Sequence, residues 1–96
     1  MKIRLVQQVF LKGKPNTFRE IYKEYNSDFV ARKGDYIADT AFKDPYKYEV
    51  VEVCVDYEAN MCVIRLHYVE LDTDNKEAAK KYIEMAKMHG WKCDME

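Results

Sequence analysis

A cysteine, a histidine and two carboxylates fall within one predicted β-hairpin, and these are the residue types of a thiol-dependent enzyme. The strands that we expect there place Cys54 opposite Arg65 and Glu52 opposite His67, with Asp56 further along the same outer face. Diagonal neighbours on one face of a sheet lie about 7–8 Å apart, within reach of long side chains. A base beside a thiol activates it as a nucleophile, and a nearby cation lowers the thiol pKa. Cys54 and His67 are therefore the candidates for cysteine-dependent catalysis.

The same cluster offers ligands for a metal ion, because thiolate, imidazole and carboxylate groups all bind divalent metals. The ligands would be Glu52, Cys54 and His67, but Cys54, Cys62 and Cys93 lack the CxxC spacing of structural zinc sites. No residue pattern indicates an oxyanion hole or a walled pocket. We therefore favour an ordinary cross-strand pair between Glu52 and His67, and we predict no catalytic residue, no metal and no cofactor.

The register of this hairpin follows from the alternation of its apolar residues. The strands are the Val-, Ile- and Tyr-rich runs 46–57 and 61–71, and a two-residue loop between them pairs Glu58 with Met61. Every inward position of both strands is then apolar or aromatic. Shifting the register by one residue would turn the carboxylates of the first strand onto the apolar face, where desolvation is costly.

The middle of the chain is the most acidic part of a nearly neutral sequence. The chain as a whole carries a net charge of −1, but residues 35–75 hold three basic and ten acidic side chains, and residues 1–34 hold eight basic and three acidic ones. Carboxylates spread over a rigid sheet can occupy a basic groove on another protein. The candidate partner-binding residues are Asp35, Asp39, Glu52, Asp56 and Glu58. We therefore expect a small non-catalytic binding or regulatory domain that acts through a protein partner, such as an acidic inhibitor-type protein.

The basic N-terminal third mixes cations with aromatic rings, which is typical of nucleic-acid platforms. Nucleic-acid binding is the first alternative function, and its candidate residues are Arg19, Lys23, Arg32 and Lys33. A cysteine-dependent or metal-assisted enzyme is the second alternative. The near-neutral charge of the whole chain argues against a dedicated nucleic-acid binder. The eight tyrosines would also suit an interface, including that of a homodimer.

The 96 residues are enough for one domain, which we expect to span 1–96. No run approaches the roughly 20 apolar residues that cross a bilayer, and the N-terminus lacks the unbroken apolar stretch of a signal peptide. Three cysteines are a poor disulfide framework. These features predict a cytoplasmic protein that does not enter a membrane.

The elements around the hairpin come from local patterns. Residues 2–12 alternate as a strand, and Thr17 and Glu20 form a capping box that predicts a short amphipathic helix over 17–25. A further strand is expected over 36–42, after a turn at Lys33-Gly34-Asp35.

A second capping box predicts a longer helix over 75–89, with Gly90 ending it and 91–95 returning as an edge strand. The expected fold is α+β: an antiparallel sheet of four or five strands with one short and one long helix. The element order is β-α-β-β-β-α, with a final β expected after the long helix. A ferredoxin-like fold and an SH3-like sheet with added helices are the alternatives.

Overall fold

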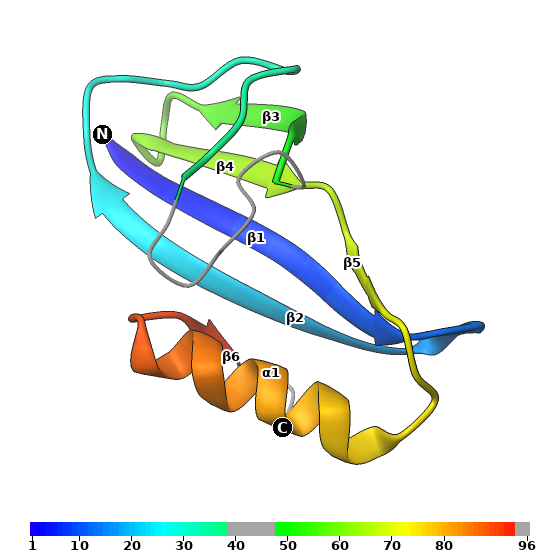
Figure 1. The fold of residues 1–96 in the computed structure, drawn as a ribbon. Helices are drawn as coiled ribbons and strands as arrows, with labels where there is room; N and C mark the ends of the chain where they lie inside the picture. The colour runs from blue at the N-terminus through cyan, green and yellow to red at the C-terminus, as the bar shows by residue number, and fades with distance from the viewer. Residues whose placement is uncertain (39–47, 94–96) are drawn as a thin grey trace.

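The fold is built on one strongly twisted mixed sheet with a helix against one face (Figure 1). The computed structural model describes residues 1–38 and 48–93, and the elements in these ranges are β1 (Lys2–Leu11), β2 (Lys14–Asn26), β3 (Val50–Asp56), β4 (Met61–Leu66), β5 (Val69–Leu71), α1 (Lys76–Met88) and β6 (Lys92–Cys93). The strand order within the described residues is β3-β4-β1-β2-β6, and β5 also pairs with β1.

The predicted fold class is wrong, and so are its ferredoxin-like and SH3-like alternatives. In the described part of the chain the sheet has six strands and only one helix accompanies it. The sheet is mixed, because β4 and β5 both run parallel to β1, whereas β2 is antiparallel to it. The coarser expectation of a small domain combining a sheet with a helix is confirmed. No helix within the described ranges is long and apolar enough to cross a bilayer.

The segment 17–25, predicted as a helix, belongs to β2. A helical stripe would place Ile21 and Tyr22 on one face, but a strand sends neighbours to opposite faces. Ile21 is fully buried, whereas Tyr22 lies on the other face, where the guanidinium carbon of Arg4 is 4.9 Å from the centre of its ring. On that same face Glu24 accepts hydrogen bonds from Arg4. Pairing along nearly the whole of β1 therefore outweighs the helical spacing.

The β3–β4 hairpin forms where predicted, but its register differs by two residues from Glu52 to Asp56. An irregularity between Val50 and Glu52 shifts the register again, and Val50 is fully buried there. Asp56 pairs with Met61, so the loop has four residues, 57–60, instead of two. Asp56 Oδ1 accepts a hydrogen bond from Ala59 N at 3.0 Å, and Asn60 takes a φ of 53°. Asp and Asn favour such turns because their side chains bond nearby backbone and Asn tolerates positive φ.

Two predicted strands are shorter or broken in the structure. The run 61–71 is divided into β4 and β5, with His67 and Tyr68 between them. Of the strand predicted over 36–42, only Tyr36 forms a bridge, opposite Glu49, and 39–42 lie outside the described residues. The strand predicted over 2–12 is confirmed as β1.

The helix predicted over 75–89 is confirmed as α1. Its N-cap is Asn75, one residue after Asp74, with which the predicted capping box begins. Asn75 Oδ1 accepts a hydrogen bond from Glu77 N at 3.0 Å. Ile83 and Ala86 are its buried residues, and Gly90 follows the helix with a φ of 91°. Such a left-handed conformation after the last turn favours glycine. The expected final strand is present as β6, which pairs with β2.

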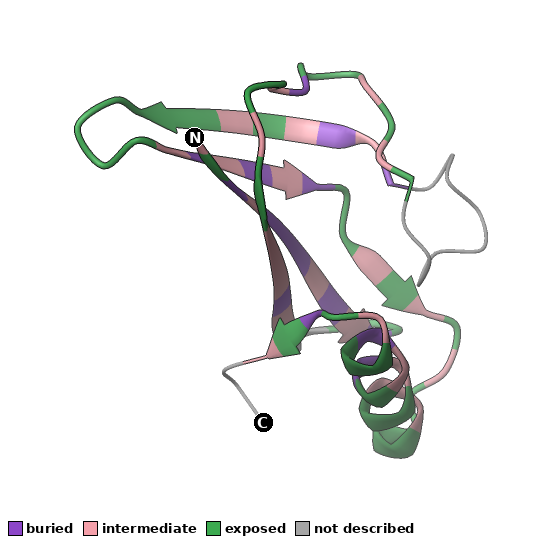
Figure 2. Ribbon diagram, turned by 90° about the vertical axis from the view of Figure 1, so that its left-hand side faces the viewer, coloured by how far each residue is buried: buried purple, intermediate pink, exposed green. Residues whose placement is uncertain are grey.

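Two segments cover the core face of the sheet, as the buried positions in Figure 2 indicate. α1 packs against β1 and β6, and Trp91 is buried beside it. The segment 27–38 crosses the other half, where Ala31 is buried in the same cluster as Ile3 and Ile64. The opposite face has no such cover in the described residues, so it is an open sheet face.

A buried glutamine joins these parts. β1 pairs with β4 as far as Val6 and with β5 from Val9, so the ladder is interrupted between them. In that gap the fully buried Gln7 donates from Nε2 to the His67 carbonyl at 3.2 Å. The Tyr82 hydroxyl of α1 donates to Gln7 Oε1 at 3.3 Å. Burial, followed by a hydrogen bond with Tyr48, raises the Tyr82 pKa well above its usual value.

We expect Gln7→Leu to lower the free energy of unfolding by about 2 kcal/mol, because it removes the hydrogen bonds to the part-buried His67 carbonyl and Tyr82 hydroxyl. Urea denaturation followed by circular dichroism measures this change. Gln8→Leu, on the open face, is the control, with an expected change below about 0.5 kcal/mol. Equal effects of the two substitutions would show that the Gln7 amide has no special role.

Candidate functional site

The outer edge of β3 is the most unusual exposed feature of the described sheet. β3 stands at the end of the strand order. Only its beginning is covered: Gly34 N donates to the Val50 carbonyl at 2.9 Å, and Val50 N donates to the Asp35 carbonyl at 2.8 Å. From Val51 to Asp56 no strand of the described ranges pairs with this edge. Edge strands of this kind present unpaired backbone groups that can template another strand.

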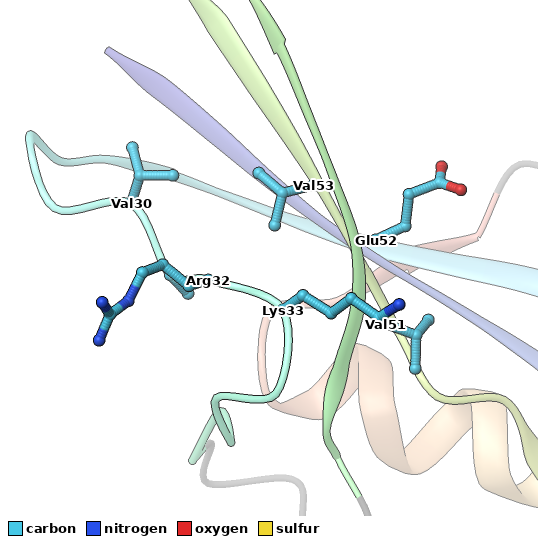
Figure 3. A pocket seen from close by; sticks show the side chains of 7 residues that line it. Val30, Arg32, Lys33, Val51, Glu52 and Val53 are labelled. Atoms are coloured by element: carbon cyan, nitrogen blue, oxygen red, sulfur yellow. The ribbon is translucent and has the colours of Figure 1, made fainter.

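A groove runs between this edge and the preceding segment (Figure 3). Its walls are the ranges 30–33 and 51–53, and its volume is about 580 Å³. Val30 and Val53 face one another across it, while Glu52 points away to the other side of β3. The groove therefore has apolar walls next to a strand edge.

Two cations stand on the rim of the groove. Arg32 and Lys33 are exposed, and neither side chain forms an ion pair with another described residue. Asp35 lies close in sequence, but its Oδ2 accepts a hydrogen bond from the Arg32 backbone N at 2.8 Å. The rim therefore offers positive charge to a ligand in the groove.

The predicted acidic residues are divided between several environments. Glu52, Asp56 and Glu58 are exposed along β3 and its turn. Glu52 lies 3.9 Å from Arg65 Nε, so its charge is partly balanced. Asp35 belongs to the segment beside the start of β3, and Asp39 lies outside the described residues. The structure thus brings three of the five together at the hairpin.

The open sheet face is a network of alternating charges, not a uniformly acidic surface. Arg65 Nη1 is 3.8 Å from Glu20, and Arg4 Nη2 is 2.9 Å from Glu24. The hydrogen bond from Arg4 is the largest influence on the Glu24 pKa and lowers it, while desolvation, the next largest, raises it. The charges of Arg4, Lys2 and Lys92 lower it further, so the Glu24 pKa lies below its usual value. Carboxylates paired in this way are poorly suited to imitate a polyanion.

The predicted thiol cluster does not form. The two-residue change in register places Cys54 opposite Val63 and Glu52 opposite Arg65. His67 follows β4, with its Nδ1 2.8 Å from the Tyr68 carbonyl and its ring against the Tyr68 ring. Within the described residues no group of three or more His, Cys, Asp or Glu side chains is placed to hold a metal ion.

The four predicted nucleic-acid residues are also separated. Arg19 and Lys23 belong to β2, whereas Arg32 and Lys33 line the groove beside β3, and β4 and β1 lie between. Lys23 Nζ donates to the His89 carbonyl at 2.6 Å. His89 follows the last turn of α1, where a positive charge interacts favourably with the helix dipole. The structure gives these residues no shared surface.

Sequence reasoning missed the groove itself. Its apolar wall comes from Val30, Val51 and Val53; the last two lie in the strand predicted over 46–57, and the sequence analysis gives Val30 no role. One signal was available: β3 carries Glu52 and Asp56 at alternate positions, and charged residues are a common protection of edge strands. The residues 30–33 and β3 are distant in sequence, so no local sequence pattern predicts that they lie side by side.

The Arg4–Glu24 pair predicts a dependence of stability on pH. Because the folded pKa of Glu24 is lowered, its stabilising effect is present above the ordinary value of 4.5 and is lost as the pH falls through the folded pKa. We expect Glu24→Gln to destabilise the protein near about pH 7 and to have little effect near about pH 2. Urea midpoints at both pH values, with Glu84→Gln as control, measure this; a pH-independent difference would contradict it.

The three cysteines should differ in reactivity. Cys54 is exposed, Cys93 is half-buried and Cys62 is fully buried. Burial, and to a smaller degree Cys54, raises the Cys62 pKa, so Cys62 has little thiolate. A thiol-specific disulfide reagent should label Cys54 first in the native protein, and Cys54→Ser should remove that phase. Cys62 should react only on unfolding; rapid native labelling of Cys62 would be evidence against this core.

Comparisons of the chain with protein-family models, with curated protein sequences and with solved structures found no match. Any function must therefore be inferred from the residues and geometry of the β3 edge, the groove and the open sheet face.

Proposed function

We propose that the protein is a small non-catalytic binding domain that recognises a protein partner at the outer edge of β3. The observation that carries this proposal is the edge from Val51 to Asp56, which lies beside the groove and pairs with no other strand in the described part of the chain. Backbone N–H and C=O groups on such an edge can pair with an extended segment of another chain.

The ends of the edge carry exposed aromatic residues. Tyr36 is 54% exposed beside the start of β3, and Tyr57 is 85% exposed in the turn that follows it. Val55, on the strand between them, is 37% exposed. Tyrosine is enriched at protein interfaces because it combines a large apolar ring with a polar hydroxyl. These side chains support a protein partner over a small ligand.

The carboxylates of the hairpin supply specificity. Glu52, Asp56 and Glu58 favour a partner with basic groups, and they discourage contact with acidic or uniformly apolar surfaces. This part of the predicted acidic surface keeps its proposed role. Nucleic-acid binding is not advanced, because its four basic residues do not share a surface.

The test is capture of a partner from host lysate by tagged protein. We expect the triple variant Glu52→Gln, Asp56→Asn and Glu58→Gln to capture roughly tenfold less partner, because it removes the charges that attract basic groups. Asn at 56 keeps the oxygen that accepts from Ala59 N, so the turn is preserved. Quantitative mass spectrometry of the eluate measures the loss.

The matched control neutralises three exposed carboxylates elsewhere, with Glu70→Gln, Asp74→Asn and Glu84→Gln. This triple variant has the same net charge as the first but leaves the carboxylates of the β3–β4 hairpin unchanged. It should therefore capture the partner as the wild type does. Equal capture by all three proteins would sink the proposed function.

A further inference from the structure

The β3 edge and its groove also indicate which kind of segment the partner contributes to the interface; this inference rests on the function proposed above. We infer that the partner contributes an extended segment of a different protein, which adds to the sheet as a strand beside β3. Its side chains alternate: acidic and apolar residues enter the groove, and basic residues lie on the opposite side.

The backbone makes strand addition possible. The segment 34–36 already lies along the same edge, bonded through Gly34, Asp35 and Val50. From Val51 to Asp56, no strand among residues 1–38 and 48–93 pairs with the edge. Main-chain hydrogen bonds along this stretch would give affinity, and alternate side chains would give specificity.

Charge selects the side chains that enter the groove. Arg32 and Lys33 stand on its rim, and their charges have no ion-pair partner among the residues that the structure describes. Val30 and Val53 line its apolar part (Figure 3). An acidic side chain beside apolar ones fits this combination, because it pairs with the rim cations while its neighbours cover the valines.

The opposite side of the added strand meets carboxylates. Glu52 points away from the groove, and Asp56 lies two alternate positions further along the same face. Cross-strand pairs of opposite charge are favourable, whereas like charges placed opposite one another destabilise the pairing. Basic side chains at every second position of the partner satisfy this face.

The same charges disfavour a second copy of this chain as the occupant. If two β3 edges paired in one continuous antiparallel sheet, their outer faces would coincide. Glu52 and Asp56 of both copies would then share adjacent strands on one face. Of these two carboxylates, only Glu52 lies close to Arg65, with Nε at 3.9 Å. A heterologous strand with alternating charge avoids this repulsion.

The experiment titrates the folded protein with the peptide Lys-Val-Lys-Glu-Lys-Val-Lys and follows backbone amides by NMR. We expect shifts along Val51–Asp56, and at least about fivefold weaker binding of the charge-swapped Glu-Val-Glu-Lys-Glu-Val-Glu, since each exposed pair contributes up to about 1 kcal/mol. The double variant Arg32→Gln and Lys33→Gln should weaken binding by a similar factor. Lys80→Gln with Lys81→Gln, on α1, should not.

A backbone N-methylated version of the first peptide keeps its charges but loses its N–H donors, and its methyl groups obstruct the approach to β3, so it should not bind. Equal binding of the two unmethylated peptides, no binding at all, or shifts away from β3 would overturn the inference. Shifts of the β3 amides that depend on protein concentration alone would assign the edge to a second copy and would also overturn it. If partner capture still requires Glu52, Asp56 and Glu58 in any of these cases, the proposed function survives without the inference.

Discussion

The Gln7 amide is the contact on which the sheet depends, because it sits where the central strand changes partners. β4 accompanies β1 up to Val6, and β5 takes over from Val9. Gln7 donates to the His67 carbonyl inside that interruption and accepts from Tyr82 of α1. The Gln7 amide is fully buried, and a buried polar group left without a partner destabilises a fold by about 1–3 kcal/mol. One side chain therefore joins both parallel neighbours of β1 to the helix. With β1 held at the centre, the β3–β4 hairpin extends the sheet outwards and β3 becomes its edge.

The elements predicted well are those specified by neighbouring residues. The helix over 75–89 has a helical apolar stripe, an Asn75 cap and a glycine after its last turn, and all of these act within a few residues. The segment 17–25 has helical spacing too, yet it forms a strand. What decides its structure is β1: Tyr22 packs against Arg4, and the carboxylates beside it pair with arginines of other strands. Those partners are distant in sequence, so no local pattern contains them.

The hairpin shows how much the apolar alternation can specify. It excludes a register shift of one residue, because the faces would exchange, but a shift of two leaves every side chain on its original face. The turn decides between the remaining registers, and Asp56 with Asn60 stabilises the four-residue loop. The face of the sheet on which Glu52 lies was therefore predictable, whereas the residue opposite it on β4 was not. The predicted proximity of Cys54 and His67 depended wholly on that undetermined shift.

The β3 edge is exposed, and charged residues on and beside the strand protect it against indiscriminate pairing with other strands. A valine-rich strand with an open edge would pair indiscriminately, and proteins commonly prevent this with charge on the edge strand. Glu52 and Asp56 have this effect on one side of β3, and Arg32 and Lys33 place the opposite charge on the other side. A second copy of the chain would place like charges next to one another. A purely apolar strand would leave these charges without partners. In our proposal, the charges that protect the edge from indiscriminate pairing are also the charges that select the strand bound there.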